Sequence, residues 1–302
     1  MDLRSKIILI YGPTASGKSN FAIKLAKKIN GEIINADSMQ IYKELKILSA
    51  RPFQKDYQKI KHHLYGFISV KKNFSTGDWL KLVEKKISFL KNKKKVPILV
   101  GGTGLYFKAL TDGLVSIPNI PTSLRNEIRS LHQKIGSKNF FLKLIKIDPL
   151  VKNRVKLTDT QRAIRAYEIK LFTKKSMYEW FKKTKSNYEK NEFYKIYIDF
   201  PRNELIKRIS LRTEKMIKKG AITEVRNFVK LKVSKNKSAC KAIGIKEIKE
   251  YLNKKIKIEN VIDKISIKTR QYAKRQNTWG RGQMADWNKL SPNNLNKFLK
   301  KI

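Results

Sequence analysis

The sequence has very little cysteine and no long hydrophobic segment. Cys240 is the only cysteine in 302 residues, which excludes an intrachain disulfide and a zinc site built on cysteines. The longest apolar stretch without charge, Val96–Phe107, is too short to span a bilayer and is broken by proline and glycine. The N-terminal residues do not have the pattern of a signal or transit peptide. These absences predict a soluble cytoplasmic protein with no membrane partner.

Acidic residues are also scarce. The chain carries 69 Lys and Arg against 24 Asp and Glu, a formal net charge of +45 at pH 7. This charge favours a polyanionic partner such as nucleic acid, although 55 of the basic residues are Lys, as the codons of an AT-rich genome alone would produce. The 14 Arg are more informative, because the forked guanidinium suits phosphates and base edges. With 41% hydrophobic residues, the chain can fill one large core or two smaller ones.

A phosphate-binding pattern begins near the N-terminus. The apolar run Ile7–Tyr11 predicts a buried strand, and the periodic apolar residues from Phe21 to Ile29 predict a helix that Gly31 ends. Between them, the backbone amides of a P-loop would surround a di- or triphosphate, with Lys18 bridging its oxygens and the Ser19 hydroxyl ligating Mg²⁺. A glycine turn that binds no phosphate is the alternative. The P-loop residues are Gly12, Pro13, Thr14, Ala15, Ser16, Gly17, Lys18 and Ser19.

Strands and helices continue to alternate after the P-loop. Apolar runs predict strands over Glu32–Asn35 and Val96–Val100, and apolar residues at helical spacing predict a helix over Asp78–Leu90. This order predicts an α/β fold with an open parallel sheet, whose ligands bind at the carboxyl ends of the strands. Asp37 and Thr103 follow closely after two of these strands, so we expect both beside the P-loop.

A different pattern starts at about residue 116, where short helices follow one another until a strand is predicted over Ile196–Phe200. Predicted helices cover Ser123–Lys134, Asn139–Ile147, Asp159–Leu171 and Ser176–Lys185. We therefore predict a helical insertion domain at 116–195. It interrupts a P-loop α/β core that consists of residues 1–115 and 196–302 and ends in C-terminal helices.

Asp37 is the candidate general base. A carboxylate that faces the phosphate loop can accept a proton or hold Mg²⁺, whereas an aspartate that caps the following turn is the alternative. Thr103 directs a hydroxyl toward the same crevice, although its Gly-Gly-Thr-Gly segment is also what a tight turn requires. The strand before Thr103 ends in glycines and lacks the magnesium-holding aspartate of typical hydrolysing P-loop enzymes. This argues against a motor or helicase.

Arginines gather in two helical segments. Gln161, Arg162 and Arg165 share a helix face at spacings of three and four residues, and Arg275 lies four residues before Trp279. Ordinary solvated faces, with Trp279 in a core, are the alternative. Because Arg is otherwise rare in this chain, the clusters favour contact with RNA. The adjacent pair His62-His63 does not suggest a metal site, because neighbouring side chains diverge.

In order and spacing, these motifs resemble the tRNA dimethylallyltransferase family of bacterial type. The resemblance covers about residues 6–287 and implies a P-loop, nucleotide-kinase-like core with a helical insertion. It also implies transfer of the dimethylallyl group of dimethylallyl diphosphate to N6 of adenosine 37 in tRNAs reading codons that begin with U. The motifs are the P-loop, Ala36–Tyr42, His62–Leu64, Gly101–Tyr106, Gln161-Arg162, and Lys274–Gln276 with Thr278-Trp279.

The resemblance also implies roles for individual residues. Asp37 and Thr103 are implied to be catalytic, Mg²⁺ is the implied cofactor at Ser19, and the partners are the anticodon stem-loop of tRNA and the diphosphate donor, bound by a monomer. The segment Lys241–Lys246 lacks the Arg and Tyr that are usual there, and Gly104 stands where a larger residue is common. The implied tRNA contacts are Asp37, Ser38, Met39, Gln40, Thr103, Arg125, Gln161, Arg162, Ala163, Ile164, Arg165, Lys241, Lys246, Lys274, Arg275, Trp279 and Arg281.

Two other functions are compatible with the motifs. A P-loop small-molecule or nucleotide kinase shares the loop and the sheet, and ATP-dependent phosphorylation of a product would identify it. An RNA-binding module could use the P-loop only as a nucleotide switch, and it would have no chemistry of its own.

Overall fold

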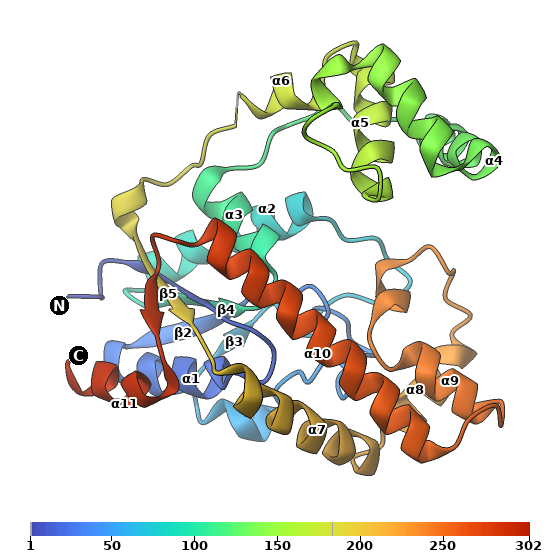
Figure 1. Ribbon diagram of the computed structural model, residues 1–302. Helices are drawn as coiled ribbons and strands as arrows, with labels where there is room; N and C mark the ends of the chain where they lie inside the picture. Colours follow the sequence, from blue (N-terminus) through green and yellow to red (C-terminus); the bar gives the residue numbers. More distant parts are fainter. Residues whose placement is uncertain (1, 183) are drawn as a thin grey trace. The chain divides into compact units, whose positions relative to one another are not determined.

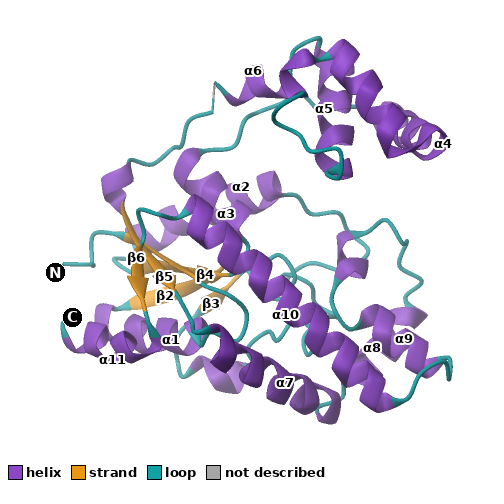
Figure 2. Ribbon diagram, in the orientation of Figure 1, coloured by secondary structure: helices purple, strands orange, loops and turns teal. Residues whose placement is uncertain are grey.

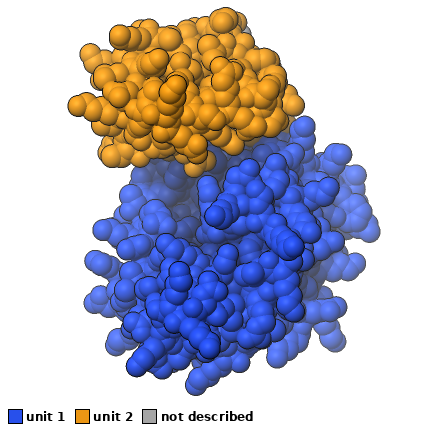
Figure 3. Space-filling view, turned by 90° about the vertical axis from the view of Figure 1, so that its right-hand side faces the viewer, with its two compact units in different colours: residues 1–111, 188–302 blue, residues 112–187 orange. Residues whose placement is uncertain are grey.

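The computed structural model describes residues 2–182 and 184–302. They form two compact units: residues 1–111 with 188–302, called unit 1, and residues 112–187, called unit 2 (Figure 3). The helical insertion predicted at 116–195 overlaps unit 2 over residues 116–187. One residue of the predicted segment, Lys183, lies outside the described residues. No described helix combines the length and the apolar character that a bilayer span requires.

Unit 1 is built on a parallel six-stranded sheet with the order β3-β2-β4-β1-β5-β6 (Figures 1 and 2). The alternation of strands and helices predicted this parallel sheet, and the structure confirms it. The strands are β1 (Ile7–Tyr11), β2 (Gly31–Asn35), β3 (His62–His63), β4 (Val96–Gly101), β5 (Phe193–Ile198) and β6 (Asn288–Leu290).

Helices cover both faces of this sheet (Figure 2). Ile8 and Ile10 of β1 pack in a core with α1 (Lys18–Ile29), whereas Leu9 and Tyr11 pack in another with α2 (Thr76–Asn92) and α3 (Gly104–Asp112). Successive side chains of a strand point to opposite faces, so a strand covered on both sides needs an uninterrupted apolar run. This is why β1 has no polar side chain before Tyr11.

The C-terminal half of unit 1 is mainly helical. Its longest helix, α10 (Ile258–Gln283), packs against α7 (Arg202–Lys218) and α9 (Ile245–Leu252). A third core joins these helices to the segment after β2 through Ile41 and Tyr42. The remaining helices of this unit are α8 (Ala221–Lys230) and α11 (Pro292–Lys300), and the 3₁₀ turns are η1 (Gln54–Tyr57), η3 (Lys190–Glu192) and η4 (Ser238–Lys241).

Unit 2 consists of helices around its own core. Helix α4 (Thr122–Ile147) is broken at Gly136, whose φ of 75° and ψ of 165° are not helical. The two helices predicted for this segment therefore meet at that glycine without a longer connection. The unit also contains η2 (Pro149–Val151), α5 (Thr160–Thr173) and α6 (Met177–Phe181).

Two predicted boundaries were wrong. Asn30, with a φ of 54°, is the left-handed residue that ends α1, and Gly31 is already part of β2. Gly31 is needed for a different reason, because a Cβ there would lie 2.5 Å from Ile98 Cδ1 of the neighbouring strand. Strand β5 begins at Phe193, within the segment predicted as insertion, and ends at Ile198.

A substitution at Gly101 should test the close approach of β4 to the segment after β2. A Cβ on Gly101 would lie 1.9 Å from the backbone oxygen of Ala36, so Gly101→Ala has to displace backbone atoms. We expect it to lower the free energy of unfolding by about 3 kcal/mol, measured by urea denaturation. Gly282→Ala is the control, because no atom lies within 4 Å of its Cβ position in α10. Equal stability of the two variants would contradict this packing.

Candidate functional site

Three loops meet at the carboxyl ends of adjacent strands in unit 1. They are the P-loop after β1, residues 36–40 after β2 and residues 102–103 after β4. Side chains from α7 and α10 reach the same place: Arg212 donates a 2.8 Å hydrogen bond to Thr14 Oγ1, and Gln276 bonds both Thr14 and Gly102. Asp37 and Thr103 therefore lie in one neighbourhood with the P-loop, as expected from their positions after the strands.

The P-loop has the geometry of an anion-binding turn. Gly17, with a φ of 84°, precedes α1, whose first backbone amides have no acceptor within the helix and direct a positive dipole at the loop. Ser16 is buried, and its Oγ has no hydrogen-bond partner among the described residues. Unpaired donors at a helix N-terminus fit a phosphate group, whose oxygens can accept from them.

Two half-buried cations lie beside this loop. Lys18 Nζ donates to the Pro13 oxygen at 3.1 Å, and burial lowers the Lys18 pKa to about 8, an effect that Asp37 opposes and Arg212 reinforces. Burial likewise lowers the pKa of Arg212, and Asp37 again opposes the shift. Because burying cations together is costly without compensating anions, this arrangement favours an anionic ligand.

The backbone around Asp37 is held by buried side chains. Asn35 Oδ1 accepts from the Asp37 amide at 2.9 Å, and Asn35 Nδ2 donates to the oxygens of Asp37 and Leu64, each at 3.0 Å. Asp37 Oδ1 accepts from the Met39 amide at 2.9 Å, which is the capping contact considered as an alternative. In the described part of the chain no donor bonds Oδ2. The carboxylate can thus stabilise the turn with one oxygen and accept a proton with the other.

Thr103 holds the segment that carries Asp37. Its Oγ1 accepts from the Ser38 amide at 2.9 Å and lies 3.3 Å from Ser38 Oγ. Its own amide donates to the Ala36 oxygen at 3.2 Å, and the Tyr272 phenol interacts with its side chain. The hydroxyl that the sequence directs toward the crevice is therefore engaged in positioning the Asp37 loop.

A cavity of about 300 Å³ brings the predicted residues together. Asp37, Ser38 and Met39 line it with Lys241 and Arg275, which are distant in the sequence. Thr14, Arg212 and Tyr272 also line it. Gln40 is not among the lining residues, and its Nε2 donates to the Ser49 oxygen at 3.1 Å.

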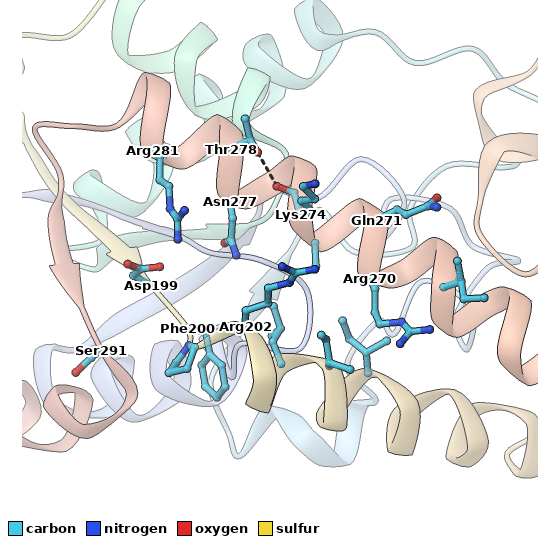
Figure 4. A pocket seen from close by; sticks show the side chains of 16 residues that line it. Asp199, Phe200, Arg202, Arg270, Gln271, Lys274, Asn277, Thr278, Arg281 and Ser291 are labelled. Carbon is cyan, nitrogen blue, oxygen red and sulfur yellow. Dashed lines mark hydrogen bonds between the residues drawn. The ribbon is translucent and has the colours of Figure 1, made fainter.

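The side chains of the predicted tRNA-binding stretch 274–281 lie in different places: some line one of two cavities, and Trp279 packs on α3. Lys274 and Arg281 line a second cavity of about 770 Å³ between α7 and α10, in which Asp199 and Arg281 lie near each other at one end (Figure 4). Trp279 is half-buried and packs on α3, because a Cβ at Gly104 would lie 2.1 Å from its Nε1. The missing side chain at Gly104 therefore makes room for the indole. Lys246 is exposed on α9, 4.0 Å from Glu250.

Two of the predicted RNA-facing residues of unit 2, Arg125 and Arg165, lie beside a buried carboxylate. Glu168, 3% exposed, lies 3.1 Å from Arg165 and 3.9 Å from both Arg125 and Arg129. This places three guanidinium groups on one anion and leaves a net positive surface. The other predicted residues of α5 differ: Arg162 is exposed and pairs with Asp159, Gln161 is exposed, Ile164 is half-buried, and Ala163 is buried, so its side chain packs in the core and is not available to RNA.

Sequence reasoning missed several residues of these sites. Arg212 and Tyr272 line the first cavity, Gln276 joins two of its loops, and Arg129 and Glu168 belong to the cluster of unit 2. A signal for Arg212 existed, because it lies four residues after Arg208 on the helix that follows a predicted strand end, in a chain poor in Arg. Gln276 belongs to the motif Lys274–Gln276, but no feature of the sequence assigns it a role of its own.

Binding of inorganic diphosphate should depend on the charge of Lys18. With a pKa near 8, Lys18 becomes neutral as the pH rises from 7 to 9, so we expect the affinity to fall about tenfold more over this range than in Lys18→Arg, which stays protonated. Titration calorimetry at both pH values gives the affinities. Titration of the ligand itself affects both proteins equally, so parallel pH curves would show that Lys18 does not contact the anion.

Comparison with known proteins identifies close relatives of this chain. Residues 40–283 match the family model of IPP transferases. The tRNA dimethylallyltransferase of Pelagibacter ubique is 56% identical over 302 residues, covering 100% of this chain and 96% of that protein. The corresponding protein of Rickettsia massiliae is 41% identical over 300 residues, covering 99% and 83%.

Solved structures resemble the fold along nearly its whole length. The crystal structure of a tRNA delta(2)-isopentenylpyrophosphate transferase from Staphylococcus epidermidis superposes with a TM-score of 0.69 at 30% identity, covering 98% of this chain and 96% of that one. A eukaryotic dimethylallyltransferase acting on tRNA superposes with a TM-score of 0.81 at 26% identity, covering 95% and 73%.

Proposed function

The chain belongs to the IPP transferase family, and we propose that it transfers the dimethylallyl group of dimethylallyl diphosphate to N6 of adenosine 37 in tRNAs that read codons beginning with U. The products are N6-dimethylallyladenosine and diphosphate. The observation that carries the proposal is the meeting of a carboxylate, Asp37, with Lys18 and Arg212 at a P-loop. The related proteins are tRNA dimethylallyltransferases, so the alternative of a kinase is not favoured.

The chemistry requires a base near the amine. The N6 lone pair of adenine is delocalised into the ring, so N6 is a poor nucleophile unless its proton is removed as the new bond forms. We assign this proton to the free oxygen, Oδ2, of Asp37. The bond from N6 to C1 of the dimethylallyl group forms, the bond from C1 to the diphosphate oxygen breaks, and its electron pair leaves with the diphosphate.

The leaving group gains negative charge in this step. Lys18, Arg212 and the unpaired amides at the start of α1 are placed to stabilise it, which explains a P-loop in an enzyme that transfers no phosphoryl group. Mg²⁺, when bound, neutralises further charge on the diphosphate. The exposed hydroxyl of Ser19, at the start of α1, would hold the ion there.

The tRNA contacts follow from where the cations lie. Adenine has to leave its stack, at a cost of a few kcal/mol, and we propose that Ser38, Met39 and Arg275 around the 300 Å³ cavity receive it. Lys241 lies on the same wall. In unit 2, the arginines around Glu168 are proposed to contact the tRNA backbone. The protein is proposed to act as a monomer.

A direct assay tests this function. We expect the purified protein, incubated with labelled dimethylallyl diphosphate, unmodified tRNA and Mg²⁺, to produce N6-dimethylallyladenosine, detected after digestion to nucleosides. The reaction should proceed without ATP, which separates it from a kinase. Absence of the prenylated nucleoside, or phosphorylation of a small molecule with consumption of ATP, would contradict the proposal.

Asp37→Asn should separate the two roles of this side chain. The amide keeps an acceptor for the Met39 amide, so the turn is retained, but it cannot take the N6 proton. We expect kcat to fall roughly 10²–10⁴-fold, with tRNA affinity within about threefold of the natural protein. Asp263→Asn, an equal charge change on an exposed residue of α10, is the control. An equal loss of tRNA binding would make Asp37 structural.

A further inference from the structure

Gln276 occupies the junction between the P-loop and the turn after β4. It lies on α10 and is 4% exposed. Its Oε1 accepts from the Thr14 amide at 2.8 Å, and its Nε2 donates to the Gly102 oxygen at 2.8 Å. Its backbone oxygen accepts from the Tyr11 hydroxyl at 2.7 Å. One side chain therefore connects loops that follow two adjacent strands.

The junction is shaped for an amide. A Cβ at Gly102 would lie 2.0 Å from Gln276 Nε2, so only glycine there lets the amide approach. One loop offers a donor and the other an acceptor, and the primary amide is a neutral side chain that satisfies both at once. A carboxylate would satisfy the Thr14 amide and repel the Gly102 oxygen. An apolar side chain would leave both backbone groups buried and unpaired, which is costly.

The two residues that Gln276 bonds lie next to groups with proposed catalytic roles. On one side, Thr14 Oγ1 accepts from Arg212 at 2.8 Å, beside the proposed diphosphate site. On the other side, Gly102 precedes Thr103, whose Oγ1 accepts from the Ser38 amide at 2.9 Å, next to Asp37. The Tyr272 phenol interacts with the side chains of both Thr103 and Gln276. The amide thus stands between the group that removes the proton and the groups that receive the leaving diphosphate.

We propose that Gln276 is a positioning residue that sets the distance between the diphosphate loop and the loop of the catalytic base, a role that rests on the proposed prenyl transfer. It touches neither substrate. Displacement of either loop by about 1 Å misaligns N6, C1 and the departing oxygen, and such errors cost up to about 100-fold in rate. Loss of the amide should therefore lower kcat more than it weakens the binding of tRNA.

The isosteric variant Gln276→Glu tests this role through its dependence on pH. We expect kcat at pH 8 to fall about 10–100-fold while the KM for tRNA stays within about threefold. Burial against the Gly102 oxygen raises the pKa of the introduced carboxyl, and the protonated form regains the missing donor. The ratio of natural to variant kcat should therefore shrink by about tenfold between pH 8 and pH 6.

Other titrating groups are common to both proteins and cancel in this ratio. Burial raises the pKa of the surrounding phenols, so they stay protonated over this range. The ionisable side chains around the amide are Tyr11, Tyr197, Tyr272, Lys18, Asp37, Arg212 and Arg275. Gln271→Glu, the same change on an exposed position of α10, controls for added negative charge on that helix and should leave the ratio constant.

The outcomes separate the two proposals. In one case the natural protein transfers the prenyl group while Gln276→Glu has an unchanged kcat, or a loss of kcat that does not vary with pH. Either result overturns the role of Gln276 and leaves the proposed function standing. A natural protein without prenyl transfer overturns the function and this role with it.

If Gln276→Glu does not fold, Gln276→Met is measured instead. It removes both hydrogen bonds without a charge, so we expect the same loss of kcat without recovery at pH 6, and an unchanged kcat would refute the role.

Discussion

The half-buried positive charge at the P-loop is the constraint on which the rest of the site depends. Arg212 lies close enough to Lys18 to lower the pKa of the lysine, and burial lowers the pKa of both side chains. Asp37 is the acidic side chain that opposes these shifts. This arrangement favours binding of an anion, and the diphosphate of the proposed reaction would supply the compensating negative charge. In that proposal, the same carboxylate stays close to the atoms that react.

This constraint explains why so many supporting contacts are polar and buried. A carboxylate beside two cations would be drawn toward them if its backbone were free, which would remove it from the amine. Asn35 prevents this by bonding the backbone on both sides of the Asp37 peptide unit, and Thr103 holds Ser38 from β4. The parallel sheet supplies the fixed points for these contacts, because β4 pairs directly with both β1 and β2. Positions of the charges are thus set by loops anchored to strands that are almost entirely apolar, with Glu32 of β2 paired to His63 of β3.

Much of this arrangement could be predicted from the sequence, and the limit has a physical cause. The β1 run, the P-loop and the α2 pattern of Trp79 and Val83 follow local rules of periodicity and turn chemistry, and the structure confirms them. The roles of Arg212 and Gln276 could not be predicted from such rules. Both side chains contact Thr14, which lies 198 positions from Arg212 and 262 positions from Gln276 in the sequence. A helical Gln or Arg has the same local pattern whether it faces solvent or a catalytic loop. The same limit applies to Gly31 and Gly104. Each must be glycine because a distant side chain, Ile98 or Trp279, occupies the space of a Cβ, and the local sequence does not identify that side chain.

The net charge of +45 has a smaller role than its size suggests. Exposed Lys side chains spread along the chain attract any polyanion, and this attraction is screened by salt and carries no information about position. The cations that distinguish one site from another are those held by neighbours: Arg165 with Arg125 and Arg129 on the buried Glu168, and Arg212 on Thr14. An arginine fixed in this way loses less side-chain entropy when it meets a phosphate than a free lysine does. Under the proposed function, a few Arg with defined partners would therefore decide which part of an RNA is bound, while the many Lys would set how strongly RNA in general is attracted.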